Sequence, residues 1–399
     1  MKFLEMKRLS ILCLALLMVF VCASCNPSGQ PSETDASDKE SANNATDKNS
    51  STIFDITDFG AVGDGETDCT EAIQKALDAA GEVKGTVIVP PGTYMTGELT
   101  MHPNTRLEGD AAWYFTEGDG NSVFVLNNPR ARYMINITGA FGCTISGMSL
   151  SGNDMGYDVH GVYLYWPNYN GGAREDTPTI EDCRIGKFTG DGVHLEHIWC
   201  FSIRHSMIHS NRGTGLYIDG WDGFVLDNWF SHNNNYGVLG GPASSSITMT
   251  GNRVEWNKKG GFSFKSGDSV NITGNFFDRS YGPAIRLNAE GTLRDFTITG
   301  NVFRRNGCPD MHYYESEYEN CSVYMNGVKN VTLVANTFKR GVNDDTYGTE
   351  SPDYDVYLAN STAVIVQSNV MYDGALKKSI VYDGQGNNII KDNLTNLPE

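Results

Sequence analysis

The sequence predicts an all-β fold, a parallel β-helix (solenoid) with a capping α-helix at its N-terminal end. Two observations carry most of this prediction. One turn position, almost always Asn, recurs through the second half of the chain, and short apolar strands that open with Gly or a small residue accompany it. A third observation is an amphipathic segment before the first strands. Repeated units that bury their apolar face only by stacking on their neighbours form a solenoid.

The recurrent turn position sets the repeat. It is occupied by Ser206, Asn228, Asn252, Asn275, Asn301, Asn336, Asn369 and Asn393. Asn at the same turn of every coil can stack as a ladder in which each side-chain amide bonds the next coil, so we expect a structural role for these residues. Two intervals are longer than the others and must carry insertions. Cys308 and Cys321 bracket the first and would close it as a disulfide, unless they are simply buried as small apolar residues.

The segment before the first strands predicts a helix. Ile73, Ala76, Leu77 and Ala80 form one apolar stripe, and Thr67 or Asp68 is expected to cap its N-terminus. A helix here would cover the open end of the stack, whose strand edges would otherwise invite aggregation.

This N-terminal region also carries a resemblance. Residues 58–65 read Asp-Phe-Gly-Ala-Val-Gly-Asp-Gly, and residues 85–94 read Gly-Thr-Val-Ile-Val-Pro-Pro-Gly-Thr-Tyr. Together with the helix between them, they resemble the opening signature of the pectate-lyase-like β-helix superfamily, which includes rhamnogalacturonase and polygalacturonase relatives and polysaccharide epimerases. The resemblance implies a right-handed parallel β-helix. It also implies action on a carbohydrate polymer, with the active site on the first sheet and its bordering loops.

The first residues predict export. Lys2, Lys7 and Arg8 precede an apolar run over residues 11–21 that is too short to span a membrane, as in a signal peptide. Small residues before Cys25 resemble the bacterial lipobox, which implies lipidation of that cysteine; ordinary secretion is the alternative. We therefore expect a signal peptide over 1–24, a flexible tether over 25–51 and one β-helix domain over 52–399. This organisation is that of an exported bacterial lipoprotein, at the cell surface or in the periplasm, which contacts the membrane only through its lipid anchor.

The strands of the first sheet predict which side chains share a face. They cover residues 161–165, 192–196, 215–219, 237–241, 261–265, 284–288 and 322–326. Strand side chains alternate, so the second and fourth residues of each strand point inward and the third and fifth point outward. Glu196 and Asp219 then become cross-strand neighbours. Two carboxylates this close resist ionising together, and a protonated acid beside an ionised partner is what glycoside hydrolysis needs.

The predicted catalytic set is Glu196 and Asp219 with His194 and Tyr217 beside them to orient or relay protons. Gly240 and Gly241 leave a hollow on the next coil. The predicted substrate-binding residues are Tyr163, Tyr165, Asp191, Trp221, Asp222, Lys265 and Arg286. Other carboxylates compete for the catalytic role, namely Asp158, Asp191, Asp222, Glu255 and Asp278. Five histidines, His160, His194, His197, His205 and His209, do not have the spacing of a known metal-ligand set, so no metal site is expected.

Three functions remain open. We favour a glycoside hydrolase or glycosyl-transferring enzyme acting on a polysaccharide or oligosaccharide without a cofactor. A polysaccharide lyase or uronate epimerase would use His194 or Tyr217 as base with Lys265 or Arg286 neutralising the uronate, and a lyase could also bind calcium. A non-catalytic glycan-binding solenoid is the third. The net charge of −18 argues against a nucleic-acid partner, and the sequence makes no prediction of oligomeric state.

Overall fold

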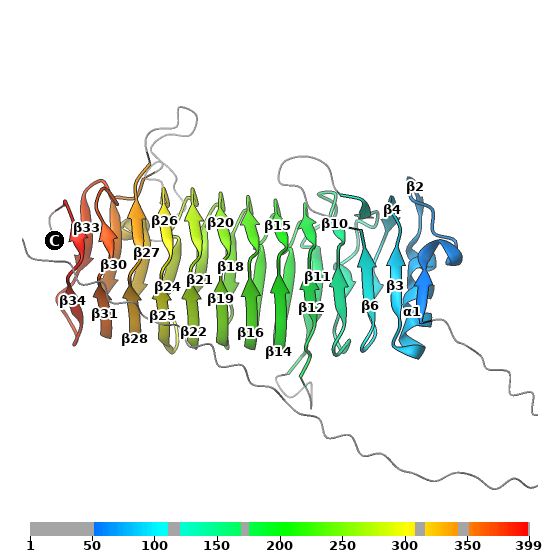
Figure 1. Cartoon of the computed structure of the whole chain (residues 1–399), viewed down its shortest axis with the longest axis horizontal. Helices are drawn as coiled ribbons and strands as arrows, with labels where there is room; N and C mark the ends of the chain where they lie inside the picture. The colour runs from blue at the N-terminus through cyan, green and yellow to red at the C-terminus, as the bar shows by residue number, and fades with distance from the viewer. Residues whose placement is uncertain (1–51, 111–119, 169–174, 308–315, 342–350, 398–399) are drawn as a thin grey trace, which may run out of the picture. The chain divides into compact units, whose positions relative to one another are not determined.

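We describe the protein from a computed structural model that covers residues 52–110, 120–168, 175–307, 316–341 and 351–397. The predicted signal peptide, Cys25, the tether up to Ser51 and Cys308 of the suggested disulfide lie outside these residues. The described residues wind into successive coils stacked along one axis, with one α-helix, α1, at the N-terminal end (Figure 1). Each complete coil contributes strands to three parallel faces, so the predicted right-handed parallel β-helix is confirmed.

Face 1 is the first sheet of the sequence-based prediction. Its strands are β5 (Leu99–Thr100), β8 (Tyr133–Asn136), β11 (His160–Tyr165), the first parts of β14 (Val193–Arg204) and β16 (Leu216–Leu226), β18 (Tyr236–Gly240), β21 (Gly260–Phe264), β24 (Ile285–Asn288), β27 (Cys321–Asn326), β30 (Tyr354–Ala359) and β33 (Lys378–Tyr382).

Face 2 lies around the next turn. Its strands are β1 (Ile53–Asp55), β3 (Thr86–Val89), β6 (Arg106–Gly109), β9 (Thr144–Ser146), β12 (Thr179–Glu181), the second parts of β14 and β16, β19 (Ser245–Thr250), β22 (Gly267–Thr273), β25 (Leu293–Thr299), β28 (Lys329–Val334), β31 (Thr362–Gln367) and β34 (Ile389–Lys391).

Face 3 is a separate sheet. Its strands are β2 (Asp64–Asp68), β4 (Gly92–Thr96), β7 (Ser122–Leu126), β10 (Ser149–Ser151), β13 (Arg184–Gly186), β15 (Met207–His209), β17 (Trp229–Ser231), β20 (Arg253–Glu255), β23 (Phe276–Asp278), β26 (Val302–Arg304), β29 (Thr337–Lys339), β32 (Val370–Met371) and β35 (Leu394–Thr395). Two 3₁₀ turns complete the elements, η1 (Ile56–Phe59) and η2 (Glu317–Glu319).

Two strands run through both face 1 and face 2 and join them into one sheet. β14 and β16 stay paired across the corner, where the register shifts between Glu196 and Ile198. His197 has a positive φ of 62° there, and Gly220 opposite leaves no room for a side chain, because a β-carbon would lie 2.0 Å from the carbonyl oxygen of Ile198. This corner carries outward-facing side chains continuously from one face to the next.

The interior confirms the predicted alternation of side chains. Val193 and Leu195 of β14 have no exposed surface, whereas His194 and Glu196 between them are partly exposed. On face 3, phenylalanines stack from coil to coil, with ring centroids 5.2 Å apart for Phe277 and Phe303. Burial of apolar side chains between coils supplies most of the favourable free energy of such a stack.

The predicted asparagine ladder is present between faces 2 and 3. The side chain of Asn275 accepts the backbone N–H of Asn252, and its own amide donates to the side chain of Asn301. A second ladder, which the repeat pattern did not predict, lies between faces 3 and 1. The side-chain amide of Asn211 donates to that of Asn233, which in turn donates to that of Asn257. Both ladders satisfy buried backbone groups at the turns.

The capping helix α1 spans Thr70–Val83, and its buried residues are the four of the predicted stripe. The predicted cap was wrong in detail. Cys69 is the N-cap residue and makes no side-chain cap bond, while Thr67 belongs to β2 and Asp68 accepts the backbone N–H of Thr70 at 3.0 Å. Among the described residues, no helix is both long and apolar enough to cross a membrane.

Candidate active site on face 1

The registers of face 1 confirm the predicted columns of outward side chains. Tyr163 pairs with His194, His194 with Tyr217, and Tyr217 with Leu239. In the neighbouring column, Tyr165 pairs with Glu196 and Glu196 with Asp219. The predicted catalytic residues therefore occupy adjacent positions on β14 and β16.

Aromatic and imidazole rings stack along the first column. The ring centroids of His194 and Tyr217 lie 4.6 Å apart with the planes inclined by 16°, and Tyr163 stacks on the other side of His194 at 5.4 Å. Tyr133 continues the stack beyond Tyr163 at 5.3 Å. The stack fixes the ring planes, so the edges that carry the titratable atoms are held at the surface.

His194 is hydrogen-bonded at both ring nitrogens. Nδ1 lies 2.8 Å from Oδ2 of Asp191, and Nε2 lies 3.4 Å from Oε2 of Glu196. Burial alone would lower the pKa of His194, but its bonds to Asp191 and Glu196 outweigh burial and raise the pKa above its usual value. Asp191 is itself held, because Oδ1 accepts the backbone N–H of Thr214 at 2.6 Å. Asp191 therefore orients the His194 ring and makes it more basic than an ordinary imidazole.

Tyr217 is held in its protonated form. Burial raises the pKa of its phenol, and the negative charges of Asp219, Glu196 and Asp191 raise it further. At neutral pH the hydroxyl is therefore a proton donor. The phenol of Tyr217 lies beside the imidazole of His194, so an acid and a base are neighbours on face 1 of the β-helix.

Glu196 and Asp219 are direct cross-strand partners, as predicted, but their environments differ. The Asp219 side chain is only 4% exposed, and its Oδ1 accepts the backbone N–H of Ala243 at 2.7 Å. Its Oδ2 lies 3.6 Å from Nε2 of His197. The Glu196 side chain is 32% exposed. Glu196 is accessible to a ligand, whereas Asp219 is mostly covered.

The predicted hollow lies beside Tyr217. It has a volume of about 440 Å³ and is lined by residues that include Tyr217, Leu239, Gly240, Gly241 and Lys265. A β-carbon at Gly241 would stand 2.6 Å from that of Asp219. Gly241 therefore creates space at the predicted place, whereas Gly240 faces inward, where a β-carbon would lie 2.2 Å from the ring of the buried Phe264.

Of the two predicted cations, one is placed correctly and the other is not. Lys265 lines the hollow with its side chain 42% exposed, and it pairs with Glu290 at 2.7 Å. Arg286 was expected to face the substrate, but it is fully buried and its Nε bonds Oε1 of Glu319 at 2.8 Å. Glu319 belongs to η2, which follows an insertion whose position in space the repeat pattern does not predict. Arg286 therefore forms a buried ion pair with a structural role.

Several other predicted residues lie elsewhere. Trp221 and Asp222 were expected at the end of a strand beside the carboxylate pair, but β16 continues past them around the corner onto face 2. The competing carboxylates Glu255 and Asp278 lie on face 3, where they pair with Arg253 and Arg305. Asp158 stays near face 1, with Oδ1 4.0 Å from Nε2 of His160.

Two of the five histidines whose spacing did not predict a metal site, His160 and His197, also lie beside the predicted catalytic residues. Nδ1 of His160 accepts the backbone N–H of Asp191 at 3.0 Å, and its ring lies 4.5 Å from that of His194 with the planes tilted by 44°. His197 packs beside Tyr165 at 6.3 Å. The strand positions of these two histidines could have predicted their place at this site. His160 begins the strand that pairs with β14, and His197 directly follows Glu196.

The structure also brings together ligand atoms that sequence spacing did not indicate. Glu196, His197 and Asp219 place one ligand atom each within 4.8 Å of one another, and His160, Asp191 and His194 form a second such group. In the second group the ring nitrogens of both histidines already bond Asp191. In the first, Nδ1 of His197 bonds the carbonyl of Trp166 at 2.5 Å, which turns Nε2 toward the carboxylates. Two carboxylates and one imidazole suit a divalent cation.

Comparisons with known proteins agree with this architecture. The family described as "right handed beta helix region" matches residues 133–303 and 243–396. Over 222 residues the chain is 31% identical to mannuronan C5-epimerase AlgE3 of Azotobacter vinelandii, a match that covers 52% of this chain and 12% of that protein. Alginate lyase 7 of the same organism is 31% identical over 202 residues, covering 45% of this chain and 22% of the relative. The chain thus spans less than a quarter of either relative.

Among solved structures, the A-module of the Azotobacter vinelandii mannuronan C-5 epimerase AlgE4 superposes with a TM-score of 0.64 at 20% identity. The superposition covers 86% of this chain and 98% of the module. At this level of identity the likeness concerns the fold.

Proposed function

This chain belongs to the right-handed β-helix family, and we propose that it is a carbohydrate-active enzyme that moves a proton at C5 of uronate residues in a polysaccharide. The outcome would be elimination or epimerisation. The observation that carries the proposal is the Asp191–His194 dyad stacked on the protonated Tyr217 at the edge of a hollow. The names of the relatives, a mannuronan epimerase and an alginate lyase, support uronate as the substrate class.

The two rings have complementary roles in this proposal. His194 in its neutral form takes the C5 proton through Nε2, while Asp191 holds Nδ1–H and stabilises the imidazolium that results. Tyr217 donates a proton. In epimerisation the proton goes to the opposite face of C5, and in elimination it goes to the departing O4 as the C4–C5 double bond forms.

The uronate carboxylate needs a positive charge opposite it, because loss of the C5 proton places negative charge on that group. Among the residues that line the hollow, Lys265 carries the positive charge, and its ion pair with Glu290 partly neutralises that charge. We therefore propose that Glu196, His197 and Asp219 would hold a divalent cation, which would neutralise the carboxylate. An imidazole suits zinc better than calcium, which prefers oxygen ligands. Calorimetric titration with zinc, manganese and calcium tests this directly, and Glu196→Gln should weaken binding at least tenfold.

Proton exchange in heavy water tests the reaction itself. The chain from residue 52 would be incubated with poly-mannuronate, poly-guluronate and polygalacturonate, followed by NMR for deuterium at C5 and by absorbance for unsaturated ends. We expect one of these products with at least one polymer, and its loss in His194→Ala and Tyr217→Phe. Tyr357→Phe is the matched control, since Tyr357 stacks in the same column on Tyr324, away from the hollow. Neither product with any uronan, from a folded protein, would contradict the proposal.

A glycoside hydrolase is the second candidate, favoured by the direct pairing of Glu196 and Asp219. Their oxygens lie within 4.8 Å of each other, nearest to the spacing of about 5–5.5 Å used by retaining enzymes. The 4% exposure of Asp219 is the argument against it, because a nucleophile must reach the sugar. Release of reducing ends without unsaturation or deuterium, abolished by Glu196→Gln, would favour the hydrolase. Binding without any product would favour the glycan-binding solenoid.

A further inference from the structure

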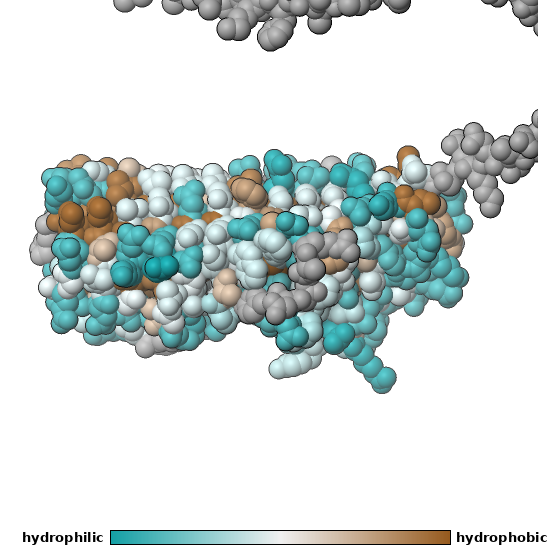
Figure 2. Space-filling view, turned by 90° about the horizontal axis from the view of Figure 1, so that it is seen from below, coloured by the Kyte–Doolittle hydropathy of each residue, from teal (hydrophilic) through white to brown (hydrophobic). Residues whose placement is uncertain are grey.

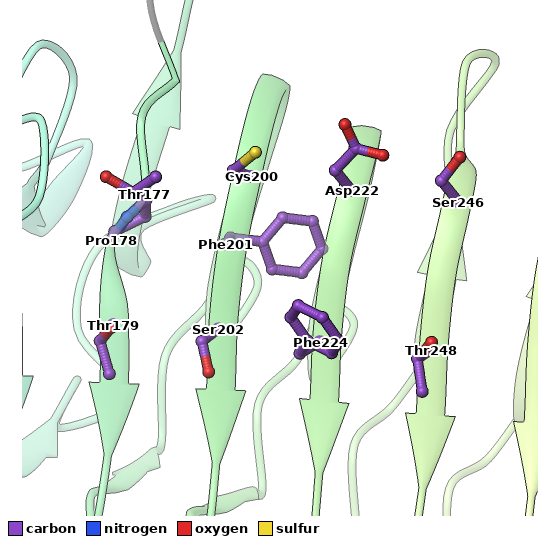
Figure 3. A pocket seen from close by; sticks show the side chains of 10 residues that line it. All are labelled: Thr177, Pro178, Thr179, Cys200, Phe201, Ser202, Asp222, Phe224, Ser246 and Thr248. Atoms are coloured by element: carbon purple, nitrogen blue, oxygen red, sulfur yellow. The ribbon is translucent and has the colours of Figure 1, made fainter.

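A groove on face 2 lies apart from the hollow beside Tyr217. It has a volume of about 460 Å³ and crosses β12, β14, β16 and β19 (Figure 3). Phe201 and Phe224 lie at its centre, and hydroxyl groups of Thr179, Ser202 and Thr248 lie along the strands that line it. The proposed reaction uses none of these residues.

Phe224 is the unusual residue of this groove. It is 53% exposed in the middle of the stack, where its ring is available to a ligand. Some of the other large apolar residues that are exposed lie in the terminal coils, which have a neighbour on one side only, namely Ile53, Ile389 and Leu394, whereas Tyr157 and Tyr165 lie along the stack. On the face drawn in Figure 2, hydrophobic side chains likewise occur as separate patches on a mainly hydrophilic surface.

The floor of the groove is built around a glycine. Gly223 precedes Phe224, and a β-carbon at position 223 would stand 2.0 Å from the ring of Phe201. The Phe201 ring therefore fills the space that a side chain at position 223 would occupy. Only 3% of the Phe201 surface is exposed. The Phe224 side chain, on the next residue of β16, lies near the Phe201 ring in the middle of the groove (Figure 3).

Polar groups at the rim are arranged to accept and donate hydrogen bonds. Asp222 is exposed, has a positive φ of 59° and accepts Nε1–H of Trp199 through Oδ2 at 2.9 Å. That bond fixes the carboxylate beside the Phe224 side chain. No Lys, Arg or His lines the described groove, so its only formal charge is negative and an anionic ligand would be repelled.

We propose that this groove is a second, non-catalytic binding site for an uncharged sugar ring of a neutral polysaccharide. The apolar face of a pyranose would lie on Phe224, and its hydroxyls would bond Asp222 and the Thr and Ser side chains. The tilted pair of Trp199 and Trp221, with ring centroids 6.4 Å apart, lies on the same two strands between the groove and face 1. Asp222, expected from sequence to bind substrate, lines this groove, whereas Trp221 does not. The inference does not depend on the proposed reaction.

Direct binding measurements test it. The chain from residue 52 would be titrated with hexasaccharides of β-1,4-linked glucose, mannose and xylose and with a mannuronate hexasaccharide, following intrinsic tryptophan fluorescence and heat. We expect at least one neutral hexasaccharide to bind and the mannuronate to bind at face 1 alone. Phe224→Ala should weaken neutral binding at least tenfold and leave turnover of a short uronate substrate unchanged.

The matched control is Tyr372→Ala, which removes an aromatic side chain of similar exposure, 56%, from the last coils. It should leave neutral binding intact. Gly223→Ala provides a second test, because displacing the Phe201 ring should also weaken neutral binding. The proposal would be overturned if no neutral hexasaccharide bound, if both aromatic variants weakened binding equally, or if Phe224→Ala weakened mannuronate binding instead.

Discussion

The hydroxyl of Tyr217 lies against Gly241, 2.7 Å from the position that a β-carbon of residue 241 would take. The glycine therefore sets both the depth of the hollow and the position of the proposed proton donor. Because real β-carbons do not come this close to other heavy atoms, any larger residue must displace Tyr217 or Asp219.

Gly241→Ala should lower the turnover of a uronan about ten- to hundredfold while the fold is kept, since displacement by roughly 1 Å can cost that much. Steady-state kinetics with thermal unfolding would measure both effects. Gly97→Ala is the control, because its added β-carbon would make only ordinary contacts, 3.4 Å or longer. Equal turnover for Gly241→Ala and wild type would show that the Tyr217 hydroxyl is not positioned by this contact.

Asp191→Asn should shift the pH dependence of the reaction. The bonds to Asp191 and Glu196 raise the pKa of His194 against burial, so removing the Asp191 charge lowers that pKa. Since the proposed base acts when deprotonated, the acidic limb of the rate profile should move to lower pH, with a lower plateau. NMR titration of the His194 ring would check the shift. Asp182→Asn, which removes the partner of His205 at 2.5 Å, should leave the His194 titration unchanged.

Local pattern predicted the registers of face 1 because side chains alternate with period two and coils stack in register. Glu196, Asp219, His194 and Tyr217 were therefore placed correctly relative to one another. Arg286 was placed in the right column and given the wrong role, since Glu319 reaches it from an insertion outside the repeat. Trp221 was misplaced for a similar reason: the corner at Gly220 turns the strand instead of ending it. Long-range contacts and corner geometry leave little trace in a single sequence.

Loss of a central ladder residue should be costly. Asn275→Ala would leave the buried N–H of Asn252 and the carbonyl of Met249 without their side-chain partner. Each such group costs about 1–3 kcal/mol, so we expect a loss of roughly 2–6 kcal/mol in the free energy of unfolding by urea. Asn393→Ala, at the half-buried end of the same ladder, should cost less. Similar losses at both positions would argue that the ladder is not what stabilises the turns.

The lipid anchor remains a proposal that rests on residues before the β-helix. If Cys25 is lipidated, Cys25→Ala should move the protein from the membrane fraction to the soluble fraction of the cell and abolish labelling by a radioactive fatty acid. Cys22→Ala is the matched control and should retain the label. Unchanged fractionation of Cys25→Ala would favour ordinary secretion.

Asp355 should make stability depend on pH. It has no exposed surface, and burial raises its pKa well above the usual value, which the Ser379 hydroxyl offsets only in part. The folded state therefore holds the proton more tightly than the unfolded chain, so folding stability falls as pH rises from about the unfolded pKa of 3.8 toward the folded pKa. Asp355→Asn removes this loss, and its melting temperature should exceed that of wild type by an amount that grows with pH and then levels off. Asp353→Asn, which breaks the ion pair with Lys377, should show no such gain. A pH-independent difference for Asp355→Asn would mean that the carboxyl stays protonated or hydrated throughout.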